Sequence, residues 1–207
     1  MRTCLAFLAI SIASVAQSSP QFGERHARQV DQNPPGIRLT IATADGRSQY
    51  HLSDELRFKL FFTSSKRRLY TVEVSNEVNA AGISDDLVIQ APDMPMPLDS
   101  KDSFSDPVVC CGSDRHYIGA TPTVATSMRF VVKWFKRSSV NLMLPGVSTP
   151  SSQLPPGDYA VFLETRRVTR GWPKSERETH HGVSNFTVTS SKILHITLLA
   201  DSPSIHR

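Results

Sequence analysis

The segment that decides the fold reads LPPGDYAVFL at residues 154–163. Its two prolines and Gly157 favour a tight turn after Leu154, because proline presets φ and glycine accepts backbone conformations that other residues avoid. Tyr159 can pack its ring beside this turn while its hydroxyl bonds back to the turn's backbone. The apolar residues that follow continue as a strand. The pattern predicts a tyrosine corner at the entrance to a central strand of a β-sandwich.

Strand-like segments occur on both sides of this corner. Leu56, Phe58, Leu60 and Phe62 recur at every second position, as expected when one face of a strand is buried. About eight such candidates are present, at residues 37–42, 56–62, 70–74, 87–89, 128–135, 159–168, 183–189 and 193–199. Helical spacing is not sustained, so the crossover helices that a parallel sheet requires are not expected. We expect an all-β domain, a two-sheet sandwich of about 7–8 strands.

The beginning of the chain has the pattern of a cleaved signal peptide at residues 1–16. Arg2 gives a positive start, an apolar run follows, and small residues stand at Ser14 and Ala16. Cys4 precedes the apolar run, which argues against a lipoprotein anchor. The alternative is an uncleaved amphipathic anchor. No later stretch reaches the roughly 20 apolar residues of a transmembrane helix. We therefore expect a secreted or periplasmic protein with no transmembrane segment after signal removal.

The remaining chain is expected to form one domain with flexible ends. Residues 17–35 are rich in Gln, Ser, Arg and Pro without an apolar period, which predicts a flexible leader. The β-sandwich is placed at 36–201, followed by a tail at 202–207. Residues 91–123 contain several prolines and little alternation, which indicates a long irregular insertion. Such a connection is either functional, disordered or a proline-rich crossover between the sheets.

Charge and cysteine content exclude two classes of protein. The chain carries 23 basic and 19 acidic residues, a net charge of +4, and the two signs are interspersed. This distribution lacks the basic stripe of a nucleic-acid-binding protein, so no nucleic-acid partner is expected. Only two cysteines follow the predicted signal peptide, too few for a fold built on disulfides.

The segment DGRSQYHLSDE at residues 45–55, followed by the apolar alternation, resembles the opening of bacterial secreted immunoglobulin-like and fibronectin-type β-sandwich domains. In these domains a tyrosine and a glycine–glutamate turn precede the second strand, whereas Asp54 stands here where glycine is usual. The closing residues 188–196 resemble their last strands. The resemblance covers roughly residues 37–200 and extends to secreted proteins of acidobacterial type. It implies an immunoglobulin-like sandwich outside the cytoplasm and brings no catalytic residues.

The adjacent Cys110 and Cys111 are a possible disulfide. Neighbouring Cα atoms lie about 3.8 Å apart, which is shorter than the usual disulfide separation, so a bond between them is strained and easily reduced. The alternatives are a cross-link to another chain or two reduced thiols. No Cys-x-x-Cys spacing is present, so the pair does not indicate a redox enzyme.

Two weak candidate sites lie in one loop that is expected to form a hairpin tip. Trp172, between Arg170 and Lys174, has the character of a ligand-binding residue that stacks on a sugar or anchors a protein, unless it folds back onto the edge of the sandwich.

His180 and His181, with Glu178 and Glu176 nearby, are candidate ligands for zinc or copper, and Met94 and Met96 add thioethers that suit copper(I). No recognised metal-ligand spacing supports this, and a solvated polar loop is the alternative.

The sequence shows no pattern for catalysis. It has no Gly-x-Ser-x-Gly elbow, and the separation of paired carboxylates cannot be read from a sequence. We expect no cofactor and no enzymatic activity. The expected function is that of a non-catalytic interaction or accessory module for a cell-envelope protein or glycan. A periplasmic copper- or zinc-binding protein is the alternative, and an extracytoplasmic hydrolase comes third. The oligomeric state stays open.

Overall fold

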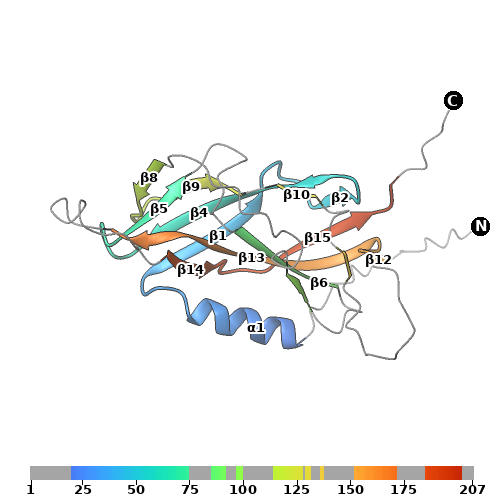
Figure 1. Cartoon of the computed structure of the whole chain (residues 1–207), viewed down its shortest axis with the longest axis horizontal. Helices are drawn as coiled ribbons and strands as arrows, with labels where there is room; N and C mark the ends of the chain where they lie inside the picture. The colour runs from blue at the N-terminus through green and yellow to red at the C-terminus, as the bar shows by residue number, and fades with distance from the viewer. Residues whose placement is uncertain are drawn as a thin grey trace, which may run out of the picture.

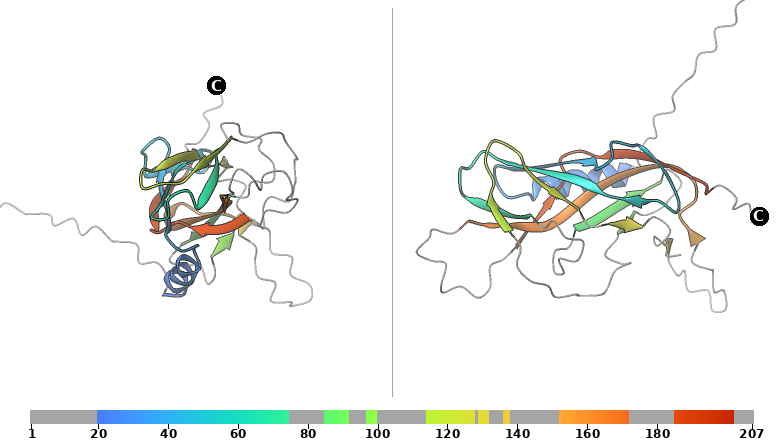
Figure 2. Two further views of the ribbon diagram at one scale, coloured as in Figure 1. Left: turned by 90° about the vertical axis from the view of Figure 1, so that its left-hand side faces the viewer. Right: turned by 90° about the horizontal axis from the view of Figure 1, so that it is seen from above.

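The computed structural model describes residues 20–74, 85–91, 97–99, 114–127, 129–131, 136–137, 152–171 and 185–201. This part of the chain is mostly β, with one short helix and two main sheets that are not closed into a barrel. Figures 1 and 2 show the helix outside the larger of the two sheets. Within the described ranges, no helix has the length and apolar character needed to cross a membrane. The predicted signal peptide and the C-terminal tail at 202–207 lie outside the described residues.

The smaller sheet has the strand order β1-β4-β9. Its antiparallel strands are β1 (Ile37–Thr43), β4 (Phe58–Ser64) and β9 (Thr123–Thr126). The alternating burial of β1 and β4 follows their alternating sequence, because successive side chains point to opposite faces of a sheet. Two further pairs stand apart from the main sheets. They are β3 (Glu55–Leu56) with β10 (Phe130–Val131) and β11 (Lys136–Arg137) with β12 (Ser152–Gln153).

The larger sheet is built around one long strand, β13 (Gly157–Arg170). Its other strands are β2 (Gln49–His51), β5 (Tyr70–Val74), β6 (Asp85–Gln90), β7 (Leu98–Asp99), β8 (Asp114–Tyr117), β14 (Asn185–Thr189) and β15 (Leu194–Leu199). β15 and β14 pair with one edge of β13, while β6 and β5 pair with the other. β2 then joins β15, β8 joins β5 and β7 joins β6. The strand predicted to be central is therefore central.

The turn before β13 has the hydrogen bond that the tyrosine-corner pattern predicts. The Tyr159 hydroxyl donates to the carbonyl oxygen of Pro155 at 2.6 Å. The side chains of Tyr159 and Leu154 are both buried. The bond satisfies the buried end of the tyrosine and fixes the angle at which the chain enters the sheet.

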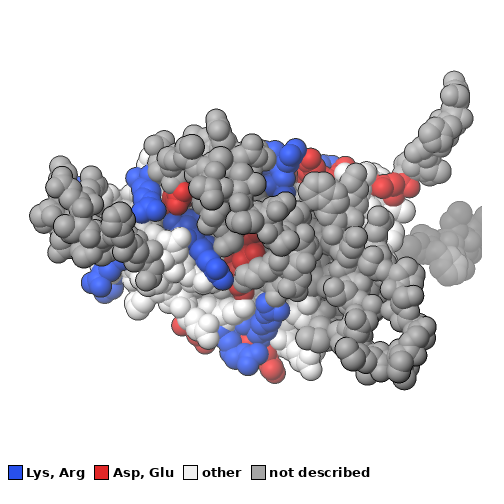
Figure 3. Space-filling view, in the orientation of Figure 1, with Lys and Arg blue, Asp and Glu red and all other residues white. Residues whose placement is uncertain are grey.

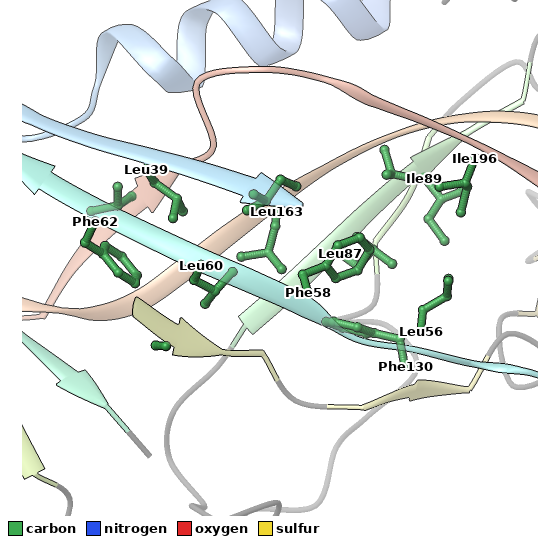
Figure 4. Packing of buried hydrophobic residues seen from close by; sticks show 14 of the residues in the cluster. Leu39, Leu56, Phe58, Leu60, Phe62, Leu87, Ile89, Phe130, Leu163 and Ile196 are labelled. Atoms are coloured by element: carbon green, nitrogen blue, oxygen red, sulfur yellow. The ribbon is translucent and has the colours of Figure 1, made fainter. Parts of the chain in front are cut away.

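The main hydrophobic core lies between the two sheets. Figure 4 shows Leu39, Leu60 and Phe62 of the smaller sheet facing Leu87 and Leu163 of the larger one. Each of these five side chains is fully buried. Such a core is the dominant stabilising contribution in a domain of this kind.

Residues 20–35 differ from the predicted flexible leader. The helix α1 (Pro20–Asp31) packs on the outer face of the larger sheet, where Phe22 is fully buried and its ring centroid lies 5.0 Å from that of Phe162. His26 Nε2 lies 2.7 Å from the Ser190 carbonyl oxygen. After the helix, Asn33 exchanges two hydrogen bonds with the backbone of Thr189, at 2.7 and 2.9 Å. A single buried aromatic residue gives no repeating apolar period, so the sequence did not indicate this docking.

The predicted irregular insertion at 91–123 contains regular structure in its described parts. β7 pairs with β6, β8 pairs with β5, and β9 begins at Thr123 and pairs with β4. The strand predicted at 128–135 is represented by β10, which pairs with β3. Short strands of this kind depend on their neighbours in the sheet, so their sequences carry a weak signal.

Candidate functional site

Of the predicted ligand-binding, metal-binding and disulfide residues, the structure describes one. Arg170 is exposed at the end of β13. The others lie outside the described residues, namely Trp172, Lys174, Glu176, Glu178, His180 and His181 of the loop, together with Met94, Met96, Cys110 and Cys111. The metal and disulfide hypotheses therefore stay predictions. Within the described part, no three His, Cys, Asp or Glu side chains are grouped to hold a metal ion.

The turn between β4 and β5 presents three consecutive cations to solvent. Lys66, Arg67 and Arg68 are all exposed. The turn is held by Ser64, whose Oγ accepts a hydrogen bond from the Lys66 amide at 3.0 Å and donates to the Lys66 carbonyl oxygen at 3.1 Å. The Ser64 amide also donates to the Gly119 carbonyl oxygen at 2.7 Å. Local side-chain bonds of this kind fix a turn without help from a ladder.

The backbone of this turn is constrained at two points. Arg68 has a φ of 57°, in the left-handed region that residues other than glycine seldom adopt. Such a conformation costs of order 1–3 kcal/mol and persists only where the surrounding structure imposes it. Gly36, with a φ of 86°, lies so close to the turn that a Cβ on it would be 2.6 Å from Ser65 Oγ. The turn is thus both strained and closely packed.

Gly171 brings the end of β13 against the same turn. Its amide donates to the Leu69 carbonyl oxygen at 2.7 Å. A Cβ at Gly171 would lie 2.9 Å from Cε1 of Tyr117 and 3.0 Å from the carbonyl oxygen of Arg68. The absence of a side chain therefore lets the Tyr117 ring lie beside this backbone, while 42% of the tyrosine stays exposed. The position of Trp172 follows directly in the chain.

We call this region the basic end, defined by Lys66, Arg67, Arg68, Arg115, Tyr117, Arg170 and Gly171. Arg115 lies 3.8 Å from a carboxylate oxygen of Glu73. The other four cations form no ion pair within the part of the chain described here. Figure 3 shows Lys and Arg side chains along this end of the visible face, where β5, β8 and the end of β13 lie. Sequence reasoning found Arg170 but missed the rest, because three separate segments meet here.

A second polar cluster holds the segment that carries the family resemblance. The Tyr50 hydroxyl donates to Asp45 Oδ1 at 2.6 Å, and Arg47 Nε donates to Asp45 Oδ2 at 2.7 Å. The guanidinium of Arg47 also lies 4.6 Å from the centre of the Tyr50 ring. Asp54 accepts from Arg47 Nη1 at 3.2 Å and from the His51 amide at 3.1 Å. The aspartate at the position where glycine is usual thus closes the turn through its side chain.

The hydrogen bonds of this cluster shift the pKa values of Asp45 and Tyr50. The hydrogen bond from Tyr50, followed by those from Arg47, lowers the pKa of Asp45 from 3.8 to about 2. Burial, and then the bond to Asp45, raise the pKa of Tyr50 to about 12. We expect Tyr50→Phe to raise the pKa of Asp45 toward its ordinary value, because the largest stabiliser of the carboxylate is removed.

Carboxyl NMR titration checks this expectation, with Tyr70→Phe as the matched control, because the Tyr70 hydroxyl binds the Pro35 carbonyl oxygen instead. Since the folded pKa is depressed, the contribution of Asp45 to stability is present above pH 3.8 and is lost as the pH falls toward 2. An Asp45 pKa that is unchanged in Tyr50→Phe contradicts the assignment.

A buried ion pair crosses the interior near the start of β6. Arg167 donates to Asp85 through Nε at 2.9 Å and through Nη2 at 2.6 Å. Thr165 Oγ1 donates to the same carboxylate at 2.7 Å, and Arg167 Nη2 reaches the Thr126 carbonyl oxygen of the smaller sheet at 3.1 Å. An irregularity in β13 between Thr165 and Val168 accompanies this arrangement, as bulges commonly re-aim a side chain. Both charged residues are at most 5% exposed, so the pair joins the two sheets and does not meet solvent.

Comparisons with known proteins assign no family to the chain. No family model and no curated protein matches it. Among solved structures, the chain is similar to a beta-glucosidase from Listeria innocua in complex with isofagomine, with 10% identity over 80% of this chain and a TM-score of 0.34. The same enzyme in complex with glucose gives 11% identity over 78% of the chain and a TM-score of 0.32. The chain spans only 16% of those structures, and similarity at this level carries no argument about function.

Proposed function

We propose that the chain is an immunoglobulin-like, non-catalytic interaction domain that binds a cell-envelope glycan or protein through its basic end. The observation that carries the proposal is the contact between the Tyr117 ring and Gly171. An exposed aromatic ring thus lies against Gly171, the residue that directly precedes Trp172 in the chain, with the backbone of Arg68 close by. Exposed aromatic and arginine side chains are the residue types enriched in binding surfaces.

The immunoglobulin-like part of the proposal is supported by three features. The chain has two facing sheets, a tyrosine corner at Tyr159 and a long central strand. The segment 45–55 resembles the opening of such domains. Action outside the cytoplasm depends on the predicted signal peptide at residues 1–16.

The proposal is tested by replacing the aromatic residues. We expect Tyr117→Ala and Trp172→Ala to weaken binding by at least about fivefold, because interface aromatics that matter contribute more than about 1 kcal/mol. Binding is measured by interferometry after a screen of the wild-type protein against arrayed neutral and acidic polysaccharides and immobilised cell-envelope proteins.

Leu199→Ala is the matched control, since Leu199 is also an exposed apolar residue, at 36%, but pairs with β2 at the other end of the larger sheet. Thermal unfolding establishes that each variant is folded. A ligand that binds the wild-type, Tyr117→Ala and Trp172→Ala proteins equally well defeats the proposal, as does a screen that yields no ligand.

A further inference from the structure

The turn that carries three cations of the basic end is already ordered in the ligand-free protein. Lys66, Arg67 and Arg68 sit on a turn fixed by Ser64 and packed on Gly36. Because the backbone is already ordered, a ligand that binds here loses little affinity to the ordering of the turn. The left-handed φ of Arg68 shows that the turn keeps a costly conformation in the free protein.

Four cations of the basic end have no anionic partner within the described part of the chain. Lys66, Arg67, Arg68 and Arg170 are exposed and form no ion pair there. Clustered like charges repel one another, and an anionic ligand relieves that repulsion while gaining charge-assisted hydrogen bonds. Of the possible ligand classes, an anion is therefore the one that these four cations favour.

A row of polar side chains beside these cations indicates what carries the anion. Asn185, Thr169, Thr71 and Tyr117 lie directly opposite one another on four neighbouring strands. The hydroxyl oxygens of Thr71 and Thr169 are 2.9 Å apart. Residues opposite one another share a face of the sheet, and four strands span about 14 Å.

The row lies on the face of the sheet turned away from the core, because the intervening Val72 and Val168 belong to the core. Arg115 shares that face with Tyr117, two positions away on β8. Thr169 is buried, so the exposed members of the row are Asn185 and Tyr117. The exposed ring of Tyr117 for stacking, with Asn185 for hydrogen bonding and Arg115 beside Glu73 on the same face, suits a sugar chain that carries acidic groups. A lipid surface fits less well, since Tyr117 is the one large exposed apolar side chain at this end among the described residues.

We propose that the ligand of the basic end is an anionic polysaccharide. Its acidic groups bind Arg67 and Arg68, and a sugar ring stacks on Tyr117. This inference rests on the proposed function, because it names the ligand class of the same surface.

The test compares two double variants that remove the same charge. Arg67→Ser with Arg68→Gly removes two cations of the basic end, and the glycine retains the positive φ without strain. Lys59→Ser with Lys192→Ser is the control, because both residues are exposed and lie outside the basic end, Lys59 on β4 and Lys192 between β14 and β15. The probes are polygalacturonate, neutral dextran, polyglutamate, and vesicles of phosphatidylcholine and phosphatidylglycerol in equal parts.

We expect the wild-type protein to bind polygalacturonate more tightly than the other three probes. The basic-end variant is expected to lose roughly tenfold in affinity, the effect of two exposed charge contacts. The control variant is expected to stay within about twofold. Raising the salt concentration should weaken binding of the wild-type protein, because the Debye length falls from about 10 Å at 0.1 M to about 3 Å at 1 M. Thermal unfolding should show the basic-end variant to be at least as stable as the wild type.

Five outcomes overturn the inference. Equal loss in the two double variants shows a general effect of net charge. Binding to polyglutamate that is as tight, and indifferent to Tyr117→Ala, shows that a sugar is not needed. Preference for the vesicles shows a lipid surface. If Tyr117→Ala weakens binding of dextran while the arginine variant does not, the proposed function stands and the anionic ligand is wrong; if neither variant affects any ligand, both fail.

Discussion

Asp85→Ala is expected to lower the free energy of unfolding by about 3–5 kcal/mol, because it leaves the Arg167 charge buried without its partner. The guanidinium cannot readily replace the lost carboxylate with water, since Arg167 is only 5% exposed. Its Nη1 already has no hydrogen-bond partner within the described structure. For a domain whose total stability is about 5–15 kcal/mol, this loss is a large fraction. Urea unfolding followed by circular dichroism measures it.

A double variant separates the contribution of the ion pair itself from the cost of leaving one charge buried without its partner. We expect Asp85→Leu combined with Arg167→Met to be much less destabilising than Asp85→Ala, because replacing both ions by apolar groups removes the uncompensated charge. Thr165→Val, which deletes one hydrogen bond to the same carboxylate, is the milder control at about 1 kcal/mol. A cost below about 1 kcal/mol for Asp85→Ala, or a double variant as unstable as the single one, contradicts the buried pair.

Phe162→Ala is expected to cost about 3–5 kcal/mol, the usual effect of deleting a buried aromatic ring. Phe162 is fully buried on the central strand, and its ring centroid lies 5.0 Å from both Phe22 and His26 of α1. The variant therefore removes the surface on which the helix packs and leaves a cavity between the larger sheet and α1. Urea unfolding measures the loss.

Phe22→Ala removes the ring that α1 contributes to the same aromatic contact. We expect a smaller effect on global unfolding, because α1 can detach while the two-sheet core stays folded. Hydrogen exchange should accelerate in the α1 amides and stay unchanged in β13. If Phe162→Ala costs no more than Phe22→Ala, Phe162 contributes only to the docking of the helix and not to the sheet.

The sequence predicted the strands whose signal is local. The alternation of Leu56, Phe58, Leu60 and Phe62 reports which face of β3 and β4 is buried. The corner before Tyr159 is likewise local, since its hydrogen bond joins residues 155 and 159. Such signals can be read without knowing which strand a segment pairs with, because a period of two, or a proline–glycine turn, is a property of a few consecutive residues.

The candidate site was predicted only in part. Arg170 and the adjoining loop were identified because tryptophan beside cations is conspicuous in a sequence. Arg68 and Tyr117 were not identified, because nothing in the neighbouring sequence distinguishes either residue. They come together at Gly171 only through the register of β5, β8 and β13. The Asp85–Arg167 pair escaped for the same reason: burial of a charge depends on a partner that is distant in the chain.

By itself, the sequence determined that the chain is mostly β and that the strand after LPPGDY enters the sheet through a corner. Only the tertiary structure decided that this strand lies at the centre of the larger sheet with two partners along each edge, that α1 covers its outer face, and that its far end meets the Lys66–Arg68 turn. Strand pairing joins residues far apart in the chain, and its register is set by the combined burial of both partners, which no single segment specifies.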